Sequence, residues 1–273
     1  MSAEAAKITI EKRPMTEEVT LAPSMRVVLT IARNTFRESV RDRVFLNLLV
    51  FACVVIGVSF LVSDLSAGQE ARVITDFGSA AMLVIGSALA IFVGVQLVRR
   101  EIERRTAYPT LARPINRSHL LVGKHLGLIA LLLVNTVAQT SVIAVVLLAK
   151  RDLTGARLLS LSSDAGLIFL ELTIIVALAQ MFSTFAGTTF SALVTLSLVI
   201  IGHFSADLLA LSSSASRMRA VYLALYYALP NFSRFQCDQM TAHDLWTALL
   251  YALAYQSAIL ALSVMIFARR DLK

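Results

Sequence analysis

The chain has 273 residues, of which 57% are apolar and only 16% are charged, and its mean hydropathy is +0.74. Soluble domains carry about 45–50% apolar and about 25% charged residues, so this composition excludes an ordinary soluble protein and indicates an integral membrane protein. Two cysteines are too few for a disulfide scaffold. The net charge of +7 does not point to nucleic acid, because in a membrane protein the position of the positive charges matters more than their sum. No nucleic-acid partner is expected.

Residues 1–24 mix acidic and basic residues without an apolar core, so we expect a flexible cytoplasmic tail and no cleavable signal peptide. In the next segment, 25–43, apolar residues and arginines recur at helical spacing on opposite faces, which predicts an amphipathic helix. We expect this helix to lie in the inner headgroup layer against anionic lipids. The residues with this interfacial role are Arg33, Phe36, Arg37 and Arg41. A plain positively charged flank of the first span is the alternative.

Six apolar stretches are long enough to cross a bilayer, whose core of about 30 Å takes roughly 20 helical residues. They cover residues 44–63, 77–98, 126–149, 165–186, 188–211 and 245–268. Helices are predicted rather than a barrel, because a lone helix satisfies its own backbone hydrogen bonds and barrel strands are short and alternating. The expected fold is an all-α integral membrane protein. Residues 44–273 form its six-helix domain, with a long external loop at 212–244.

The distribution of lysine and arginine predicts the orientation. Six spans place both termini on one side of the membrane. Eighteen of these residues fall in the N-terminal segment, the loop between the second and third spans and the C-terminus, against seven in the other loops. Because positive loops stay inside, both termini are expected in the cytoplasm. Lys150 and Arg151 are the exception, since they cluster on the predicted outer face.

The loop between the second and third spans, Arg99 to Lys124, is unusually rich in charge and contains two prolines. The first residues, Arg99 to Arg105, are expected to continue the second span as a helix. Pro109 and Pro114 then disfavour helix in the residues before them, and Asn116 or Ser118 caps the returning helix. This shape suits a rigid projection that docks a soluble partner. A solvated run of charges explains the same residues equally well.

The pattern E-R-R-T-x-Y-x-x-L-A-R-P-I-x-R-x-x-x-L-V-G-K-x-x-G, from Glu103 to Gly127, resembles the first cytoplasmic loop of ABC-2-type export permeases. The C-terminal run 267–272, the segment 229–232 and the run 183–202 are similar to other parts of these proteins. The resemblance covers residues 25 to 273. It implies a type V exporter-like architecture of six spans, with both termini inside and an amphipathic elbow helix before the first span.

The resemblance further implies an exporter that lies in the cytoplasmic (inner) membrane and is driven by a separate ATPase. ATP and Mg²⁺ would be bound by that partner, because this chain has no phosphate-binding loop: Gly123 and Lys124 are followed by His125. Two ATPase copies, a second permease copy, membrane lipids and an extracytoplasmic accessory protein are the expected partners. The residues expected to couple to the ATPase are Arg99, Arg100, Glu101, Glu103, Arg104, Arg105, Thr106, Tyr108 and Leu111.

Three titratable residues fall inside predicted spans: Glu171, His203 and Asp207. A charge near the centre of a membrane helix costs about 2.5–3.5 kcal/mol, so each needs a physical reason. His203 and Asp207 are four residues apart and share a helical face. We expect the three to line a translocation pathway or gate, with a contact between His203 and Asp207. The alternative is that the carboxylates reach the headgroups and His203 bonds to a neighbouring helix.

Smaller signals concern helix packing. Gly86, Ala90 and Gly94 form a strip of small residues that permits close packing, expected within the chain rather than between copies. Gln96, Gln139 and Gln180 are expected to form hydrogen bonds between helices.

No catalytic motif and no metal-ligand spacing is present, so no catalytic residue and no metal site are predicted. The favoured function is therefore a transport permease. A membrane anchor that docks an ATPase without moving a solute is the first alternative, and a membrane-embedded enzyme is the second. The substrate cannot be read from the fold, because similar scaffolds carry unrelated cargo.

Overall fold

The computed structural model describes residues 22–39, 45–63, 69–104, 117–205, 219–221, 226, 229–235 and 242–269. In these residues the regular secondary structure is helical throughout, as predicted. The elements are α1 (Ala22–Ser39), α2 (Phe45–Ser63), α3 (Glu70–Arg104), α5 (Arg117–Ala149), α6 (Gly155–Ser183), α7 (Thr188–His203), the 3-10 turn η2 (Phe232–Phe235) and α10 (Ala242–Arg269). The predicted tail up to residue 21 and most of the loop 212–244 lie outside the described residues.

Among the residues that the structure describes, four helices are long and apolar enough to cross a membrane. These candidate spans are Glu70–Gln96, Ser118–Ala149, Gly155–Ser183 and Asp244–Ile266. Two shorter apolar helices, Leu46–Leu61 and Thr188–His203, fall where the first and fifth spans are predicted. The chain is therefore a multi-pass helical membrane protein, and crossing by α2 and α7 stays a prediction.

Two helices begin earlier than predicted. α3 begins at Glu70 rather than at residue 77, and α6 begins at Gly155 rather than 165. α5 begins at Arg117, ahead of its apolar stretch and between the two predicted cap residues Asn116 and Ser118. A helix can extend into polar residues when the free backbone N–H groups of its first turn find hydrogen-bond acceptors, and an apolar pattern does not reveal such a cap. At α6 the cap is Thr154, whose side-chain oxygen accepts from the Arg157 N–H at 3.3 Å.

Helix α6 is the centre of the bundle. Most of its side chains from Leu161 to Ser183 are buried, and it packs against α3, α5, α7 and α10. The small residues of α3 face it: a Cβ on Gly86 would lie 2.9 Å from Leu172, and one on Gly94 would lie 2.8 Å from Ala179. The prediction that this strip packs within the chain is thus confirmed.

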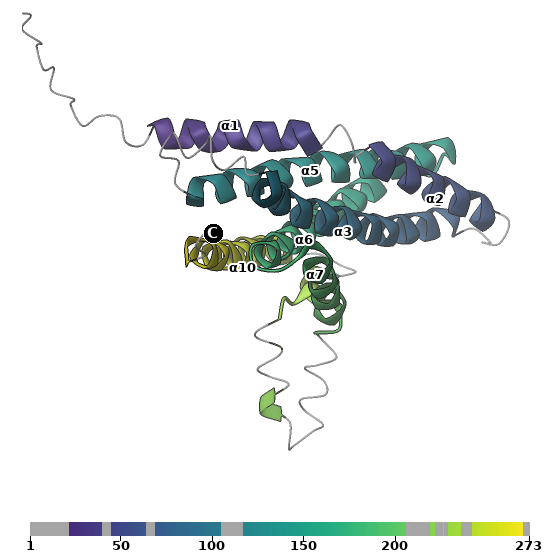
Figure 1. The fold of residues 1–273 in the computed structure, drawn as a ribbon. Coiled ribbons are helices and arrows are strands. Elements are labelled where there is room, and N and C mark those ends of the chain that lie inside the picture. Colours follow the sequence, from purple (N-terminus) through teal and green to yellow (C-terminus); the bar gives the residue numbers. More distant parts are fainter. Residues whose placement is uncertain are drawn as a thin grey trace, which may run out of the picture.

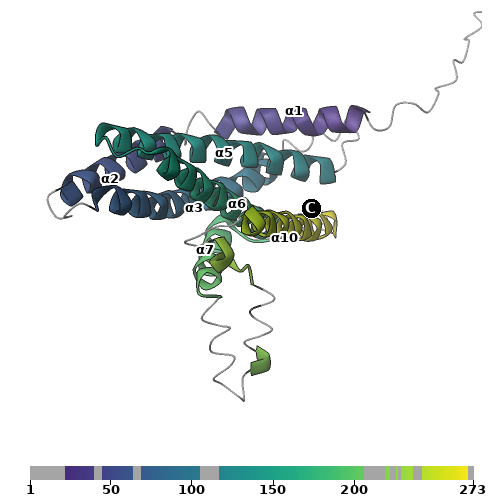
Figure 2. The ribbon, with the colours of Figure 1, turned by 180° about the vertical axis from the view of Figure 1, so that it is seen from behind.

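Helix α1 lies alongside the first half of α5 (Figures 1 and 2). A Cβ on Gly123 would lie 2.9 Å from the Val28 carbonyl oxygen, and one on Gly127 would lie 2.6 Å from that of Ala32. The equal step of four residues on both helices shows that they run in the same direction. The predicted helix over residues 25–43 is present as α1, and it packs along α5 because the two glycines admit its backbone. Its place in the inner headgroup layer stays a prediction.

At the other end of the bundle, segment 229–235 packs on the end of α7. Gly202 has no room for a side chain, since a Cβ there would lie 2.5 Å from the Phe232 ring and 2.7 Å from the Pro230 carbonyl oxygen. Helix α7 itself is turned away from the direction of α3 and α5 in both views (Figures 1 and 2). It follows α6 after the short turn 184–187.

Candidate functional site

The loop predicted to dock a partner is flanked by two long helices. α3 continues to Arg104, which confirms the predicted helical continuation up to that residue, and α5 begins at Arg117. Five of the coupling residues therefore lie on the backbone of the last turns of α3: Arg99, Arg100, Glu101, Glu103 and Arg104. The other four lie outside the described residues: Arg105, Thr106, Tyr108 and Leu111. The two prolines and Asn116 lie outside them as well.

Near this end of the bundle, His125 of α5 contacts Gln180 of α6; we call them the loop-side pair. Gln180 Nε2 donates to the Leu121 carbonyl oxygen at 3.1 Å, and Gln180 Oε1 lies 3.1 Å from His125 Nδ1. A carbonyl only accepts, so the amide orientation is fixed and His125 Nδ1 carries the proton that bonds to Oε1. Both side chains are fully buried. The pair therefore ties α5 to α6 without a charge.

The predicted role of the glutamines is confirmed at two positions. Besides Gln180, Gln139 of α5 donates to Asn47 Oδ1 of α2 at 3.0 Å, and Asn47 in turn donates to the Ile85 carbonyl oxygen of α3 at 3.2 Å. His125 was not predicted to take part, because a lone histidine near a helix end gives no periodic signal.

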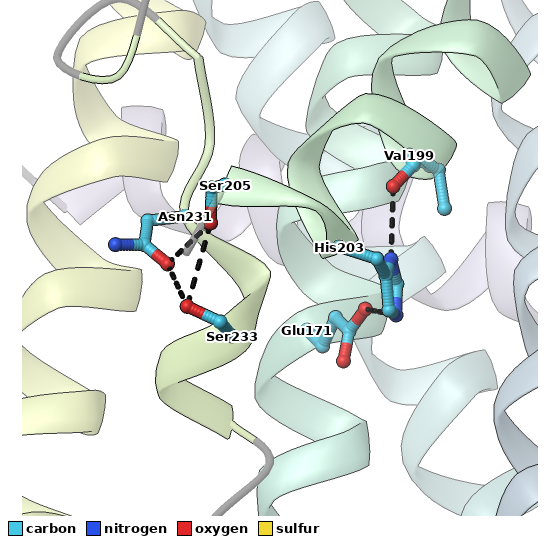
Figure 3. A network of polar contacts seen from close by, with 6 residues as sticks. All are labelled: Glu171, Val199, His203, Ser205, Asn231 and Ser233. Atoms are coloured by element: carbon cyan, nitrogen blue, oxygen red, sulfur yellow. Dashed lines mark hydrogen bonds and ion pairs between the residues drawn. The ribbon is translucent and has the colours of Figure 1, made fainter. Parts of the chain in front are cut away.

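Glu171 of α6 and His203 of α7 meet in the part of the bundle away from the loop; we call them the far-side pair (Figure 3). Glu171 Oε1 lies 3.0 Å from His203 Nε2, a contact that is an ion pair when His203 is protonated, and its angles are outside the range of a hydrogen bond. His203 Nδ1 lies 2.8 Å from the Val199 carbonyl oxygen. The Glu171 side chain is 1% exposed and that of His203 is 22% exposed. Two of the three predicted pathway residues are thus in contact.

The third predicted pathway residue, Asp207, lies outside the described residues. The predicted contact between His203 and Asp207 therefore stays untested. Both ring nitrogens of His203 already face oxygen atoms, those of Glu171 and Val199. The partner across the helix interface was not predicted, because sequence spacing reports contacts within one helix and not between two.

Next to this pair, hydrogen bonds of Asn231 join four parts of the chain. Its Oδ1 accepts from Ser205 at 2.7 Å and from Ser233 at 2.6 Å (Figure 3). Its Nδ2 donates to the Tyr226 hydroxyl at 3.0 Å, and its backbone N–H donates to the Tyr251 hydroxyl of α10 at 2.8 Å. Asn231 therefore fastens the residues after α7 to segment 229–235 and to α10.

Residues 29–272 match the family model described as ABC-2 family transporter protein. The chain belongs to this family. A comparison with curated proteins finds no match. The match confirms the resemblance drawn from the loop motif, and it spans α1 from Leu29, both histidine pairs and segment 229–235. Members of the ABC-2 family generally work with a partner ATPase subunit.

In this ABC-2 family protein, the arginines assigned to the interfacial helix lie on an exposed face of α1. Arg33 and Arg37 are exposed, and Phe36 is half-buried. Arg41 lies outside the described residues. The neighbouring edge of the helix is apolar and also exposed, with Met25 77% and Leu29 69% exposed. Helix α1 thus presents a basic face and an apolar edge, while a third face packs on α5.

Among the residues that the structure describes, no three histidine, cysteine or acidic side chains come together as metal ligands. The ionisable contact inside the bundle that invites a chemical role is the far-side pair. It holds one acid and one base.

Proposed function

We propose that the chain is the permease subunit of an ABC exporter, driven by ATP that a separate ATPase hydrolyses while docked on the loop 99–124. The observation that carries this proposal is the length of α3. Its apolar span ends at Gln96, yet the helix continues to Arg104. Eight further residues extend it by about 12 Å. A stiff, charged arm of this length suits a lever that a soluble motor moves.

The proposed topology has six spans, including α2 and α7. The 19 residues of α2 are about 28 Å long and the 16 residues of α7 about 24 Å. Helices slightly shorter than the hydrocarbon core cross by local thinning of the bilayer. Both termini and the loop 99–124 then face the cytoplasm, and α1 takes the place of the elbow helix, with Arg33, Arg37 and Arg41 toward the anionic inner leaflet.

In this proposal, motion passes from the loop into the bundle along α5. The first turns of α5 carry Leu121 and His125, and both contact Gln180 of α6. The middle of α6 holds Glu171 against His203. ATPase closure would bias this chain of contacts between two states. Glu171, His203 and Asp207 are the proposed lining of the pathway or its gate. By family analogy a second permease copy and two ATPase copies complete the exporter, with Mg²⁺ and ATP on the ATPases.

The proposal is tested by co-purifying the tagged chain with its ATPase and measuring ATP turnover in nanodiscs. Glu103→Arg and Arg105→Glu are expected to lower the permease-dependent ATPase rate by tenfold or more, while membrane insertion is unchanged. A tenfold loss corresponds to about 1.4 kcal/mol of coupling free energy. Asp76→Arg is the matched control, since Asp76 is an exposed acid at the opposite end of α3. Unchanged docking and turnover in both loop variants would reject the coupling role.

The anchor alternative predicts a different outcome in the same experiment. An anchor binds the ATPase, but ATP then leaves the distance between α6 and α7 unaltered. A permease changes that distance with each nucleotide state. Spin labels on exposed positions of the two helices distinguish the two functions without knowledge of the substrate.

A further inference from the structure

The far-side pair has a protonation state that its geometry determines. The Val199 carbonyl oxygen can only accept a hydrogen bond, so His203 Nδ1, 2.8 Å away, carries a proton. The remaining ring nitrogen, Nε2, faces Glu171 Oε1 at 3.0 Å. Without a proton on either group, an unprotonated ring nitrogen and a carboxylate oxygen would lie 3.0 Å apart inside an apolar bundle, where such repulsion is strong. The pair therefore holds one proton, either on Nε2 or on the Glu171 carboxyl group.

With this proton bound, the pair has no net charge, whichever of the two atoms carries it. On Nε2 it makes an imidazolium beside a carboxylate, and on Oε1 it makes a neutral ring beside a carboxylic acid. Its loss would leave a bare carboxylate on a side chain that is 1% exposed, which is costly. The pair can lose its proton only if α6 and α7 separate and admit water. His203, which is 22% exposed, is the side from which water reaches it.

No other charge in the described part of the chain contacts this pair. Other ionisable groups have partners of their own: Arg234 of η2 lies over the Tyr251 ring, Tyr255 stacks on Tyr251, Arg72 pairs with Asp76 on α3, and Lys150 of α5 pairs with Glu70. Asp207 follows His203 by four residues outside the described residues, and it needs a control of its own.

The pair is also connected to the parts that would move. His203 is the last residue of α7, and its ring lies 5.4 Å from that of Phe232. Gly202 packs against Pro230 and Phe232, and Ser205 bonds to Asn231 and Ser233. The end of α7 and segment 229–235 therefore form one unit. Its direct polar contact with the middle of α6 is the far-side pair.

We propose that Glu171 and His203 form a proton-binding site inside the membrane domain, and that one bound proton holds α7 and segment 229–235 closed against α6. Release of the proton opens this end of the bundle, and its rebinding closes it. The site needs no ATPase to bind a proton. Its failure is therefore distinguishable from failure of the proposed coupling role.

The test measures opening and proton count on the full chain in nanodiscs. Spin labels are placed at the exposed positions Phe204 and Ser162, after both native cysteines are replaced by serine. The label distance is followed upward from about pH 6, where histidine begins to titrate. The expected result is an increase in distance with the slope of one proton. Nitrogen NMR of labelled histidine is expected to show protons on both ring nitrogens of His203, or one on Nδ1 with a protonated Glu171, until the distance changes.

The decisive variant is Glu171→Gln. Its amide can donate to a neutral ring or accept from a charged one, so the contact persists without a titrating acid, and the distance is expected to stay short at every pH. Asp76→Asn is the matched control and is expected to keep the transition, as is Asp207→Asn. A wild-type distance that ignores pH would overturn the proposal, as would a transition that survives Glu171→Gln or vanishes in Asp207→Asn. If Glu171→Gln does not fold, the histidine spectra of the wild-type chain decide alone.

Discussion

Helix α6 makes two side-chain contacts with histidines, one near its centre and one near its C-terminal end, and they differ in charge. At the loop side Gln180 accepts from His125, and at the far side Glu171 faces His203. The two α6 residues are nine positions apart, or about 14 Å along the axis. Both histidines use Nδ1 as a donor, to an amide oxygen in one case and to a backbone carbonyl in the other.

The difference lies in the α6 side chain that each histidine contacts. The loop-side pair is completed by a neutral amide and is sealed from solvent, with His125 2% exposed. The far-side pair is completed by a carboxylate and is partly open to solvent at His203. A neutral, sealed contact keeps one geometry whatever the proton concentration, which suits a joint that transmits motion. A pair of titratable groups has two states, which suits a joint that opens.

The largest effect is expected from breaking the loop-side pair. Gln180→Leu leaves His125 Nδ1–H buried without a partner, and each such group costs about 1–3 kcal/mol. The Leu121 carbonyl oxygen also loses the donor that Gln180 Nε2 supplied, which adds to this loss. Thermal unfolding in nanodiscs should therefore show a strongly lowered Tm. His125→Leu with Gln180→Leu removes both partners and is expected to restore part of the stability. If the double variant is as unstable as the sum of the single ones, the two side chains do not act as a pair.

A smaller effect is expected from loosening the far side. Gly202→Ala places a Cβ against the Phe232 ring and the Pro230 carbonyl oxygen, and overpacking of this kind costs about 1–3 kcal/mol. Segment 229–235 should then be cleaved faster by protease from outside, while the loop-side contact is kept. Gly166→Ala on α6 is the matched control, because nothing lies within 4 Å of its Cβ. That control should be neutral or slightly stabilising, since alanine favours helix over glycine. Equal protease sensitivity in both variants would argue against the packed unit.

Much of the helical fold follows from the sequence because length and hydropathy are local properties. Each predicted span falls on a helix, but α6 begins ten residues before residue 165, at Gly155. Its first turns are polar and are held by the Thr154 cap, so the apolar pattern could not locate that end. The contact of α1 with α5 was not predicted for another reason. Gly123 and Gly127 are four residues apart on α5, and this signal for close approach was not combined with the amphipathic pattern of residues 25–43.

The candidate site was predictable in part. Glu171 and His203 stand out because a charge inside a span needs a reason. Their pairing depends on how α6 and α7 pack after the turn 184–187, which no spacing within one helix reports. Asn231 was missed as a centre, because its partners Ser205, Tyr226, Ser233 and Tyr251 are brought together only by the fold. The loop 105–116 was predicted from its motif, and its structure stays a prediction.

The comparison between the two pairs is sharpened by giving the loop side the chemistry of the far side. Gln180→Glu changes an amide to a carboxyl of the same size, so the expected loss of stability is below that of Gln180→Leu while the carboxyl is protonated and the contact with His125 is kept. When that proton leaves, a buried carboxylate faces the Leu121 carbonyl oxygen, an acceptor that Gln180 Nε2 satisfied before. A spin-label distance between α5 and α6 that ignores pH in the wild-type chain should then change with pH in this variant. Glu171→Gln makes the opposite change at the far side and should remove the pH dependence there. If Gln180→Glu leaves the α5–α6 distance independent of pH, a carboxyl group is not what allows a buried histidine contact to open. The proposed difference in function between the loop-side pair and the far-side pair would then be wrong.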